Sequence, residues 1–274
     1  MKKIKKILII IQRANGDVLL SHSLINSLNN YYVAPEIDLL VNDDTLALAR
    51  LLPNINLIHT FSYKKKRDER WMQEKKLLKK IYKRYDLSIN LTASDRSVVY
   101  SLLAAKKSIS AIEEKPQKSW WKKLLLSHYY YFDTSKHILV NNLKALSLLN
   151  IKQEVNYNFP DISNEVTHKV KNLLTSKEIN EFIIFHPSAQ YKFKVYPRHL
   201  RDQLLADLNS LDIPIVVSGS NNKLDLKIKS ELPKLKNLYD FIGELSLEEY
   251  FALSQLSLAY IGMDTLNMHI ASVQ

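Results

Sequence analysis

One carboxylate near the start of the chain stands where a catalytic base could be placed. Residues 12–20 read QRANGDVLL and follow a short apolar run. We expect a strand to end there, a loop to turn on Gly16 and a helix to begin at Asp17. A carboxylate in a loop at the end of a strand can reach a substrate proton and act as a general base. It can also cap the first helical turn, and such a cap stabilises a helix by about 1 kcal/mol. Composition alone favours the cap.

A second group of polar residues, HPSAQYKFKVYP at 186–197, follows another apolar run. Small and hydroxyl residues such as Ser188 can offer N–H groups and hydroxyls to a phosphate. Lys192 or Lys194 could neutralise a diphosphate. An exposed polar loop, ending in a proline that begins the next helix, fits the same residues equally well.

A third group, at residues 259–272, reads AYIGMDTLNMHIAS. The pattern predicts a strand, a turn and a helix, with Asp264 or Thr265 as the helix N-cap. The N-terminus of a helix attracts anions, and His269, about one turn into the helix, could donate to a phosphate. A single histidine is more often structural, so both interpretations remain open.

Composition excludes several classes of protein. The 274 residues include no cysteine, which excludes disulfide scaffolds, Cys-ligated zinc, Fe–S clusters and thiol catalysis. No apolar run approaches the roughly 20 residues of a membrane span, and the apolar run at 7–11 lacks a signal-peptide cleavage site. We expect a cytoplasmic protein. The sequence also lacks zinc-protease, P-loop and dinucleotide-binding motifs, and we expect no metal site.

Positive charge is concentrated in one segment. Residues 64–84 hold eleven basic and three acidic side chains, a net charge of +8 out of +11 for the whole chain. Such a segment indicates an anionic partner: a nucleic acid, a membrane face or a phosphorylated substrate. A solvated lysine-rich helix is equally compatible with it.

Strand-length apolar runs alternate with helix-length amphipathic segments, which predicts parallel sheets with right-handed crossovers. The strands are almost wholly apolar, as expected when helices cover both faces of a sheet. A polar stretch at 150–164 separates two such patterns, so we expect two α/β domains, 1–155 and 156–274, with a cleft between them. The expected strands are 7–12, 36–41, 56–61, 87–91, 108–112, 181–186, 214–218, 238–242 and 258–262, and the expected helices are 17–31, 43–51, 94–105, 137–149, 165–174, 198–208 and 247–256.

Only four glycines are present, and each falls at or just after the end of an expected strand. Ligands of parallel sheets lie outside the carboxyl ends of the strands. We therefore expect these positions to need a positive φ or a close approach of the backbone. They are Gly16, Gly219, Gly243 and Gly262.

Taken together and in order, these motifs resemble those of glycosyltransferase family nine, the bacterial lipopolysaccharide heptosyltransferases. The resemblance runs from the first strand to the last residue. Its elements are GDVLL at 16–20, YDLSINL at 85–91 followed by Arg96 and Ser97, His186-Pro187 with Lys194-x-Tyr196-Pro197, VSGS at 217–220, IGELSL at 242–247, and Gly262-x-Asp264-Thr265 with MHIA at 268–271.

The resemblance implies a GT-B fold, in which two Rossmann-like domains bind the acceptor and the nucleotide-sugar respectively. It implies inverting, metal-independent transfer of heptose from ADP-heptose to the Kdo–lipid A inner core, with no cofactor beyond the substrate. Asp17 would be the general base, with Arg13, Gly16 and Arg96 in the acceptor loops. Lys194 would stabilise the leaving diphosphate. The donor-binding residues would be Ser188, Asp264, Thr265 and His269.

The same resemblance gives the basic segment a partner, the phosphorylated glycolipid at the inner membrane face. Trp120, Trp121 and the tyrosines at 129–131 could enter that interface, or could pack in the core. We expect a peripheral enzyme and no nucleic acid partner. The rival of another class is a basic nucleic-acid-binding protein, whose affinity would fall steeply with salt.

Four features depart from the family pattern. Ser23 stands where the family usually has a proline. Tyr196 stands where a tryptophan is common, and Leu266 stands where a glycine usually follows Asp-Thr. The chain also ends at Gln274, within the helix after the donor motif, so we expect an incomplete second domain. A different nucleotide-sugar donor and a catalytically inactive truncated relative are therefore kept as alternatives.

Overall fold

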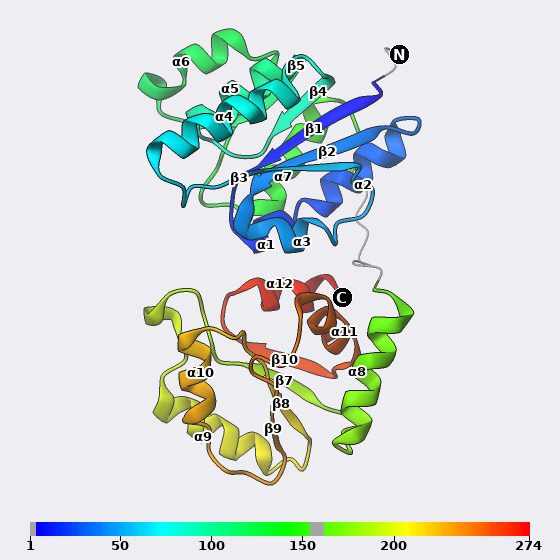
Figure 1. The fold of residues 1–274 in the computed structure, drawn as a ribbon, viewed down its shortest axis with the longest axis vertical. Coiled ribbons are helices and arrows are strands. Elements are labelled where there is room, and N and C mark those ends of the chain that lie inside the picture. Colours follow the sequence, from blue (N-terminus) through cyan, green and yellow to red (C-terminus); the bar gives the residue numbers. More distant parts are fainter. Residues whose placement is uncertain (1–3, 154–161) are drawn as a thin grey trace. The chain divides into compact units, whose positions relative to one another are not determined.

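The computed structural model describes residues 4–153 and 162–274. The chain divides into two compact units, Met1–Asn156 and Tyr157–Gln274. Each unit is an α/β fold with its own sheet (Figure 1). The domain boundary expected between residues 155 and 156 lies outside the described residues.

The sheet of unit 1 has six parallel strands in the order β3-β2-β1-β4-β5-β6. β1 lies in its interior, and its residues Ile7 to Ile11 are fully buried. An uninterrupted apolar strand is stable only where helices cover both faces, and this arrangement provides that cover. The strands are β1 Lys6–Ile11, β2 Glu36–Asn42, β3 Leu57–Phe61, β4 Tyr85–Asn90, β5 Ala105–Ile112 and β6 His128–Tyr131.

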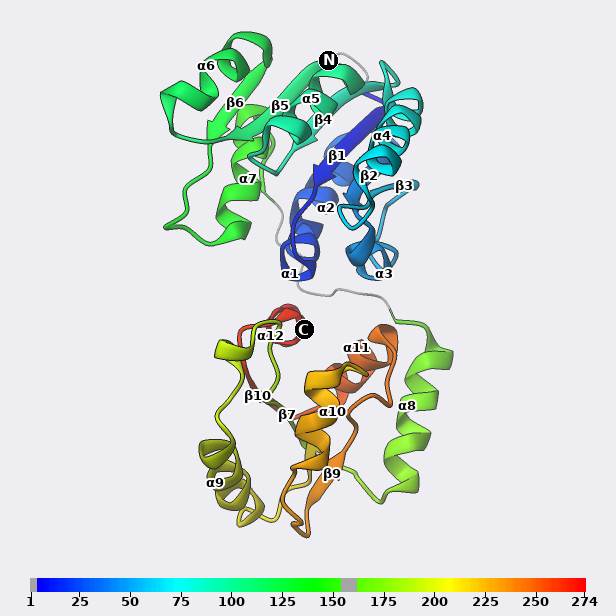
Figure 2. The same ribbon diagram turned by 60° about the vertical axis from the view of Figure 1, so that its left-hand side comes forward.

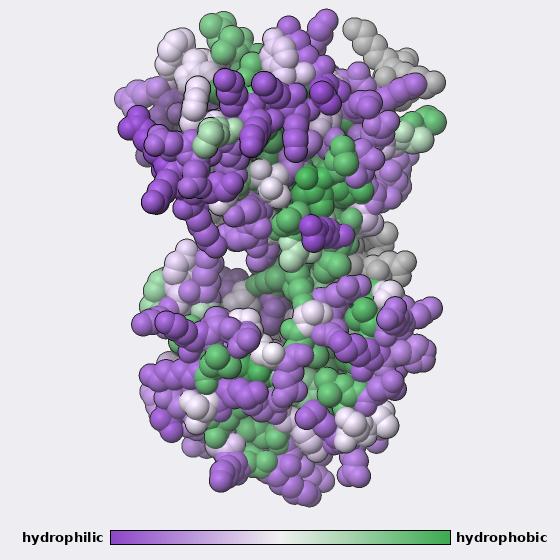
Figure 3. Space-filling view, in the orientation of Figure 1, coloured by the Kyte–Doolittle hydropathy of each residue, from purple (hydrophilic) through white to green (hydrophobic). Residues whose placement is uncertain are grey.

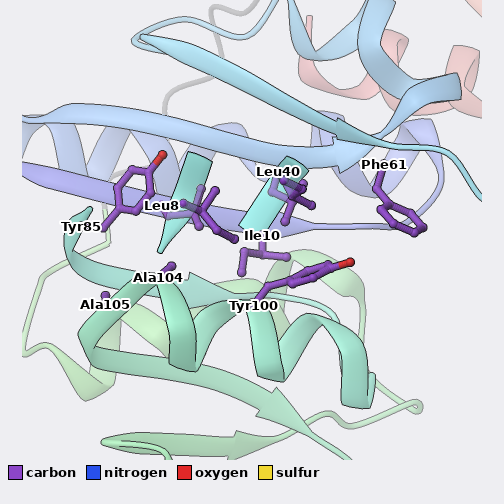
Figure 4. Packing of buried hydrophobic residues seen from close by; sticks show 10 residues of the cluster. Leu8, Ile10, Leu40, Phe61, Tyr85, Tyr100, Ala104 and Ala105 are labelled. Atoms are coloured by element: carbon purple, nitrogen blue, oxygen red, sulfur yellow. The ribbon is translucent and has the colours of Figure 1, made fainter. Parts of the chain in front are cut away.

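Helices cover this sheet on both sides (Figures 1 and 2). On one face, side chains of α4 and α5 close a core over Leu8, Ile10 and Leu40 (Figure 4). α2 and α7 pack on each other at the opposite face. The helices of unit 1 are α1 Asn15–Leu19, α2 His22–Tyr31, the 3-10 turn η1 Asp43–Thr45, α3 Leu46–Ala49, α4 Arg67–Ile81, α5 Asp95–Ala104, α6 Pro116–Leu125 and α7 Ile138–Leu148.

Unit 2 also has a parallel sheet between layers of helices, with four strands in the order β10-β7-β8-β9. One face is closed by α9 and α10, which contribute Leu205 and Ile228 to a core with Phe185 and Val217. α8, α11 and α12 lie on the other face (Figure 2). The elements are α8 Asn164–Ser176, β7 Ile183–His186, η2 Lys192–Lys194, α9 Arg198–Asn209, β8 Ile215–Val217, α10 Lys223–Ser230, β9 Leu238–Asp240, α11 Leu247–Leu256, β10 Ala259–Gly262 and α12 Leu266–Val273.

Each expected strand is present to within a few residues at its ends, but two expected helices are wrong in detail. The helix expected at 17–31 is two helices, because the chain breaks at Leu20 and Ser21, where the Ser21 hydroxyl donates to the Val18 carbonyl at 2.6 Å. The helix expected at 43–51 is a 3-10 turn followed by one short helix. The pattern also missed β6 and the helices α6 and α10, while α4 corresponds to the solvated helix considered for the basic segment.

The aromatic residues near α6 divide between core and surface. Trp121 packs against Val98 and Ile112, and Tyr130 is buried in β6. Trp120 is 64% exposed and Leu124 is 76% exposed. The core interpretation is therefore right for two of these aromatics, and Trp120 remains available to an interface. No helix within 4–153 or 162–274 is long and apolar enough to cross a membrane.

A fully buried lysine attaches α6 to the rest of unit 1. Lys122 Nζ lies 2.6 Å from Asp95 Oδ1, at the start of α5, and 2.5 Å from Glu113 Oε2, just after β5. Two carboxylates thus compensate one buried ammonium, whose isolated burial would be costly.

Replacing this lysine should destabilise unit 1. Lys122→Ala leaves both carboxylates without their partner, and we expect the free energy of unfolding in urea to fall by about 2–3 kcal/mol. Lys118→Ala, on the exposed side of the same helix, is the control and should change it by no more than about 0.5 kcal/mol. Equal effects of the two substitutions would contradict this role for Lys122.

Candidate functional site

Asp17 lies in the first turn of α1, just beyond the carboxyl end of β1. Its Oδ2 accepts a hydrogen bond from Arg13 Nε at 2.6 Å. The Arg13 guanidinium is itself held 4.9 Å from the centre of the Phe132 ring. Oδ1 takes part in no hydrogen bond within the described parts of the chain. Arg13 therefore orients the carboxylate and leaves one oxygen able to accept a proton.

The helix-cap interpretation of Asp17 is wrong. α1 begins at Asn15, and its N-cap is Ala14, which has no side chain able to cap. Gly16 lies inside α1 rather than in a turn before it, and the only described glycine with a positive φ is Gly243, at 77°. Asp17 is favoured where it stands because a negative charge in the first turn interacts well with the helix dipole.

Arg96 belongs to the loop and helix that follow β4. Its guanidinium lies 4.9 Å from the ring centre of Phe61 and 5.4 Å from that of Tyr63, and its Nε is 3.4 Å from Glu74 Oε1. β4 is the neighbour of β1 in the sheet. One hydrogen bond links the loops that follow these strands, from the backbone N–H of Gln12 to Thr92 Oγ1 at 2.9 Å. Arg13 and Arg96 therefore belong to adjacent loops at one edge of the sheet.

Two buried polar side chains near Arg13 were not anticipated. The Gln12 side chain is buried at the end of β1, and neither its Nε2 nor its Oε1 has a hydrogen-bond partner among the residues that the structure describes. The buried Tyr130 hydroxyl likewise has no partner among the described residues. Burial raises its pKa, and the positive charge of Arg13, which lowers that pKa, only partly offsets this effect. Buried polar groups are normally satisfied, so unpaired ones beside a candidate site indicate positions for water or substrate. A lone Gln in an apolar run gave no signal of this in the sequence.

In unit 2 the structure brings two of the expected site residues together. Lys194 Nζ lies 3.3 Å from Asp264 Oδ2, although the two residues come from motifs seventy positions apart. Both side chains are substantially exposed, at 43% and 65%. Thr265 is the N-cap of α12, since its Oγ1 accepts from Asn267 N at 3.3 Å. His269 lies one turn further on and is half-buried. An ammonium group and a helix N-terminus thus stand beside one strand end.

Ser188 is placed differently from expectation. It is buried, and its hydroxyl donates to Asp225 Oδ1 on α10. Asp225 Oδ2 accepts from the backbone N–H and the hydroxyl of Ser220, at 2.6 and 2.9 Å. The Ser188 hydroxyl therefore joins the loop after β7 to the loop after β8. Asp225 is the hub of this network, and nothing in its sequence context marked it.

His186, at the end of β7, forms the second link among the strand ends. Its Nδ1 lies 3.0 Å from the Ser218 carbonyl oxygen and 3.0 Å from Asn267 Nδ2 on α12. Burial lowers the pKa of His186 below its ordinary value, and this outweighs the nearby charge of Asp225 and the bond to Ser218. The imidazole is therefore neutral near pH 7 and links the loop after β8 to α12.

Gly262 meets the expectation of a close backbone approach, but the neighbour is the chain itself. A Cβ at this position would lie 2.8 Å from the His186 carbonyl oxygen and 2.5 Å from the Tyr260 hydroxyl. The absence of a side chain lets the end of β10 lie against the end of β7, which positions Asp264 and Thr265. No group of three or more metal-ligating side chains occurs within the described residues.

Comparison with known proteins decides the family. The profile of glycosyltransferase family 9 (heptosyltransferase) matches residues 74–274. The chain belongs to glycosyltransferase family 9. All the donor-loop residues and Arg96 lie within the match, whereas Arg13, Gly16 and Asp17 precede it.

Individual relatives agree with this assignment. The chain is 25% identical over 269 residues to lipopolysaccharide heptosyltransferase 3 of Escherichia coli K12. This alignment covers 95% of this chain and 77% of that protein. The chain is similar in structure to a family 9 glycosyl transferase of Veillonella parvula, with a TM-score of 0.82 at 17% identity over 99% of this chain and 78% of the other. It is also similar to E. coli ADP-heptose LPS heptosyltransferase II, with a TM-score of 0.75 at 20% identity over 98% and 82% of the two chains.

These structural similarities confirm the expected fold, and the family confirms the expected class of enzyme. The units of this glycosyltransferase have the parallel sheets of the GT-B architecture. The roles of the individual site residues stay predictions, which the experiments below address.

The neutral state of His186 has a consequence for stability. Because burial lowers the pKa of His186 in the folded chain, the unfolded chain binds this proton more readily, and stability should fall as the pH drops below the ordinary pKa of 6.5. The contribution approaches about 1.4 kcal/mol per pH unit. Urea unfolding across this range should give a shallower pH dependence for His186→Gln. His168→Gln, which removes an exposed histidine of the same unit, should keep the original slope, and an unchanged slope in His186→Gln would contradict the argument.

Proposed function

We propose that this enzyme transfers heptose from ADP-heptose to the inner core of lipopolysaccharide, by a single displacement that inverts the anomeric centre and needs no metal. The observation that carries the proposal is the family match across the donor loops, together with the Lys194–Asp264 pair beside the N-terminus of α12. The donor and acceptor classes rest on the relatives, which are heptosyltransferases of lipopolysaccharide.

On the acceptor side, Asp17 Oδ1 takes the proton of the attacking hydroxyl. The hydroxyl oxygen forms the new bond to the anomeric carbon as the bond from that carbon to the diphosphate oxygen breaks. Arg13 keeps the carboxylate in position through Oδ2. Arg96, stacked on Phe61 and Tyr63, offers a second fixed positive charge for an anionic acceptor.

On the donor side, the diphosphate leaves with the bonding electrons, and Lys194 stabilises the developing charge. N–H groups at the start of α12 add a favourable dipole. Asp264, Thr265 and His269 line this strand end, while Ser188 acts through its bond to Asp225 by holding the loop in place. A lysine and a helix N-terminus supply the positive field that a metal ion supplies in other enzymes.

A cytoplasmic, membrane-peripheral location fits a glycolipid acceptor. The basic segment forms α4 and its flanks, and the surface over α4 is mostly hydrophilic in Figure 3. Exposed lysines next to exposed Trp120 and Leu124 suit an anionic lipid surface. The nucleic-acid-binding alternative loses its support, because the family accounts for the fold and the motifs without it.

The role of Asp17 can be tested by Asp17→Asn. Turnover, followed as acceptor-dependent release of the nucleoside diphosphate from a panel of ADP-, UDP- and GDP-sugars with Kdo–lipid A as acceptor, should fall by about 10²- to 10⁴-fold. Stability should change by no more than about 1–2 kcal/mol. Asp44→Asn, which alters an exposed carboxylate after β2, is the matched control. A fully active Asp17→Asn enzyme would remove the residue from its role, and release from UDP- or GDP-sugars alone would change the donor.

The role of Lys194 can be tested in the same assay. Lys194→Ala should lower turnover by about 10²- to 10³-fold, the usual loss when a donor to a developing anion is removed. Lys192→Ala decides between the two lysines of this turn, since only Lys194 is paired with Asp264; a larger loss at Lys192 would transfer the role. Added EDTA should leave turnover unchanged, and a loss reversed by Mg²⁺ would refute metal independence.

A further inference from the structure

A cavity of about 340 Å³ lies along the outer edge of the sheet in unit 1. Its walls are β3, which is the edge strand, and α4. At about 30 Å³ for each molecule of liquid water, the cavity is larger than a bare ion needs and has room for a group the size of a monosaccharide. The lining residues are Ile58, His59, Thr60, Lys65, Glu69, Met72, Gln73, Lys76, Leu77 and Lys80.

The charges around this cavity are not balanced. Lys65, Lys76 and Lys80 face a single acidic residue, Glu69, and none of the four takes part in an ion pair within the described ranges. Lys76 and Lys80 are also four residues apart on one helix, where like charges repel. Three ammonium groups at one cavity, with a net lining charge of +2, favour a ligand with two negative charges.

A buried network fixes His59 in the wall. Tyr85 Oη donates to Asp38 Oδ2 at 2.7 Å, so its 2.9 Å contact with His59 Nε2 must be a bond donated by the histidine. Burial alone would raise the pKa of Asp38, but the nearby His59 ring and the bonds from Tyr85 and Asn56 hold that pKa below its ordinary value. Asp38 is therefore charged and anchors the pair. His59 Nδ1 has no hydrogen-bond partner among the described residues, and the ring is held in the cavity wall through Nε2.

The position of the cavity separates it from the substrate loops. Ligands of parallel sheets bind beyond the carboxyl ends of the strands, where Asp17 and Arg96 lie. This cavity instead follows α4 along the flank of the sheet, from Lys65 before the helix to Lys80 near its end. The polar network beside it comes from Asp38 and Tyr85, near the amino ends of β2 and β4.

We propose that this cavity is a second anion site, which binds a phosphate monoester carried on a sugar-sized group through Lys65, Lys76 and Lys80, with the His59 ring beside it in the wall. Charge-assisted bonds from several cations to one phosphate are strong, and Thr60 offers a hydroxyl to the attached group. Two sources share this chemistry: a soluble sugar phosphate and the headgroup of an anionic lipid. The proposal does not depend on the transferase reaction assigned above.

The test uses the full chain with isotope-labelled histidine. Titration with glucose 6-phosphate should shift the His59 ring signals in a saturable manner, whereas glucose should not. In Lys76→Gln/Lys80→Gln the affinity should fall at least about tenfold. Lys75→Gln/Lys79→Gln is the matched control, because it removes the same charges at the same spacing from exposed positions of α4 outside the cavity. It should change the affinity by less than about twofold.

Sedimentation with vesicles distinguishes the two sources. Vesicles of phosphatidylcholine with phosphatidic acid are compared with phosphatidylcholine alone. If the cavity holds a lipid headgroup, binding to the acidic vesicles is lost in Lys76→Gln/Lys80→Gln and kept in the control. If it holds a soluble ligand, both variants bind vesicles equally and only the sugar phosphate titration separates them. Equal losses in both variants in every assay, or no shift at His59, would overturn the site.

Discussion

The parallel pairing of buried strands is the constraint on which the rest of this molecule depends. β1 is apolar and buried from Ile7 to Ile11 and is paired on both sides, so this stretch can carry no polar chemistry. Parallel pairing brings the ends of neighbouring strands to the same edge, where the chain first reaches solvent. Arg13 and Asp17 follow β1 and Arg96 follows β4 at that edge for this reason. In unit 2 the same rule brings Lys194, after β7, to Asp264, after β10.

The sequence was informative wherever one physical effect dominated. Strands buried on both faces are almost purely apolar, so every one of that kind was recognisable, as was the strand–helix alternation that implies parallel sheets. β6 was missed because it is an edge strand with three successive tyrosines, of which only Tyr130 is buried. The break between α1 and α2 was missed because it depends on local bonds from Ser21, while the apolar periodicity continues across it. α6 depends on a buried lysine, and a lysine in a basic stretch predicts solvent exposure.

The candidate site was predictable as a set of loops but not as a set of contacts. The family motifs located Asp17, Lys194, Asp264 and Thr265, and the structure pairs two of these. The partners that hold them did not appear in the motifs: Arg13 was expected only as a loop residue, and Asp225 was not singled out. These partners come from distant elements, and a buried carboxylate that accepts bonds from Ser188 and Ser220 resembles any helix-start aspartate in the sequence. Tertiary hydrogen bonds give no periodic signal, so only the folded structure identifies them.

Two lysines of this chain differ in burial, and this difference decides whether each can exchange its carboxylate partner for another anion. Lys122 is fully buried between two carboxylates, and exchanging those partners would require an uncompensated ammonium in the interior. Lys194 is paired with Asp264 at the surface, where an ion pair contributes only about 0–1 kcal/mol. In the reaction proposed above, Lys194 would exchange its carboxylate partner for the diphosphate at little cost and return to it when the product leaves. Asp264 would then hold the ammonium group at the strand end between turnovers, in a weak surface pair that leaves the lysine able to bind another anion.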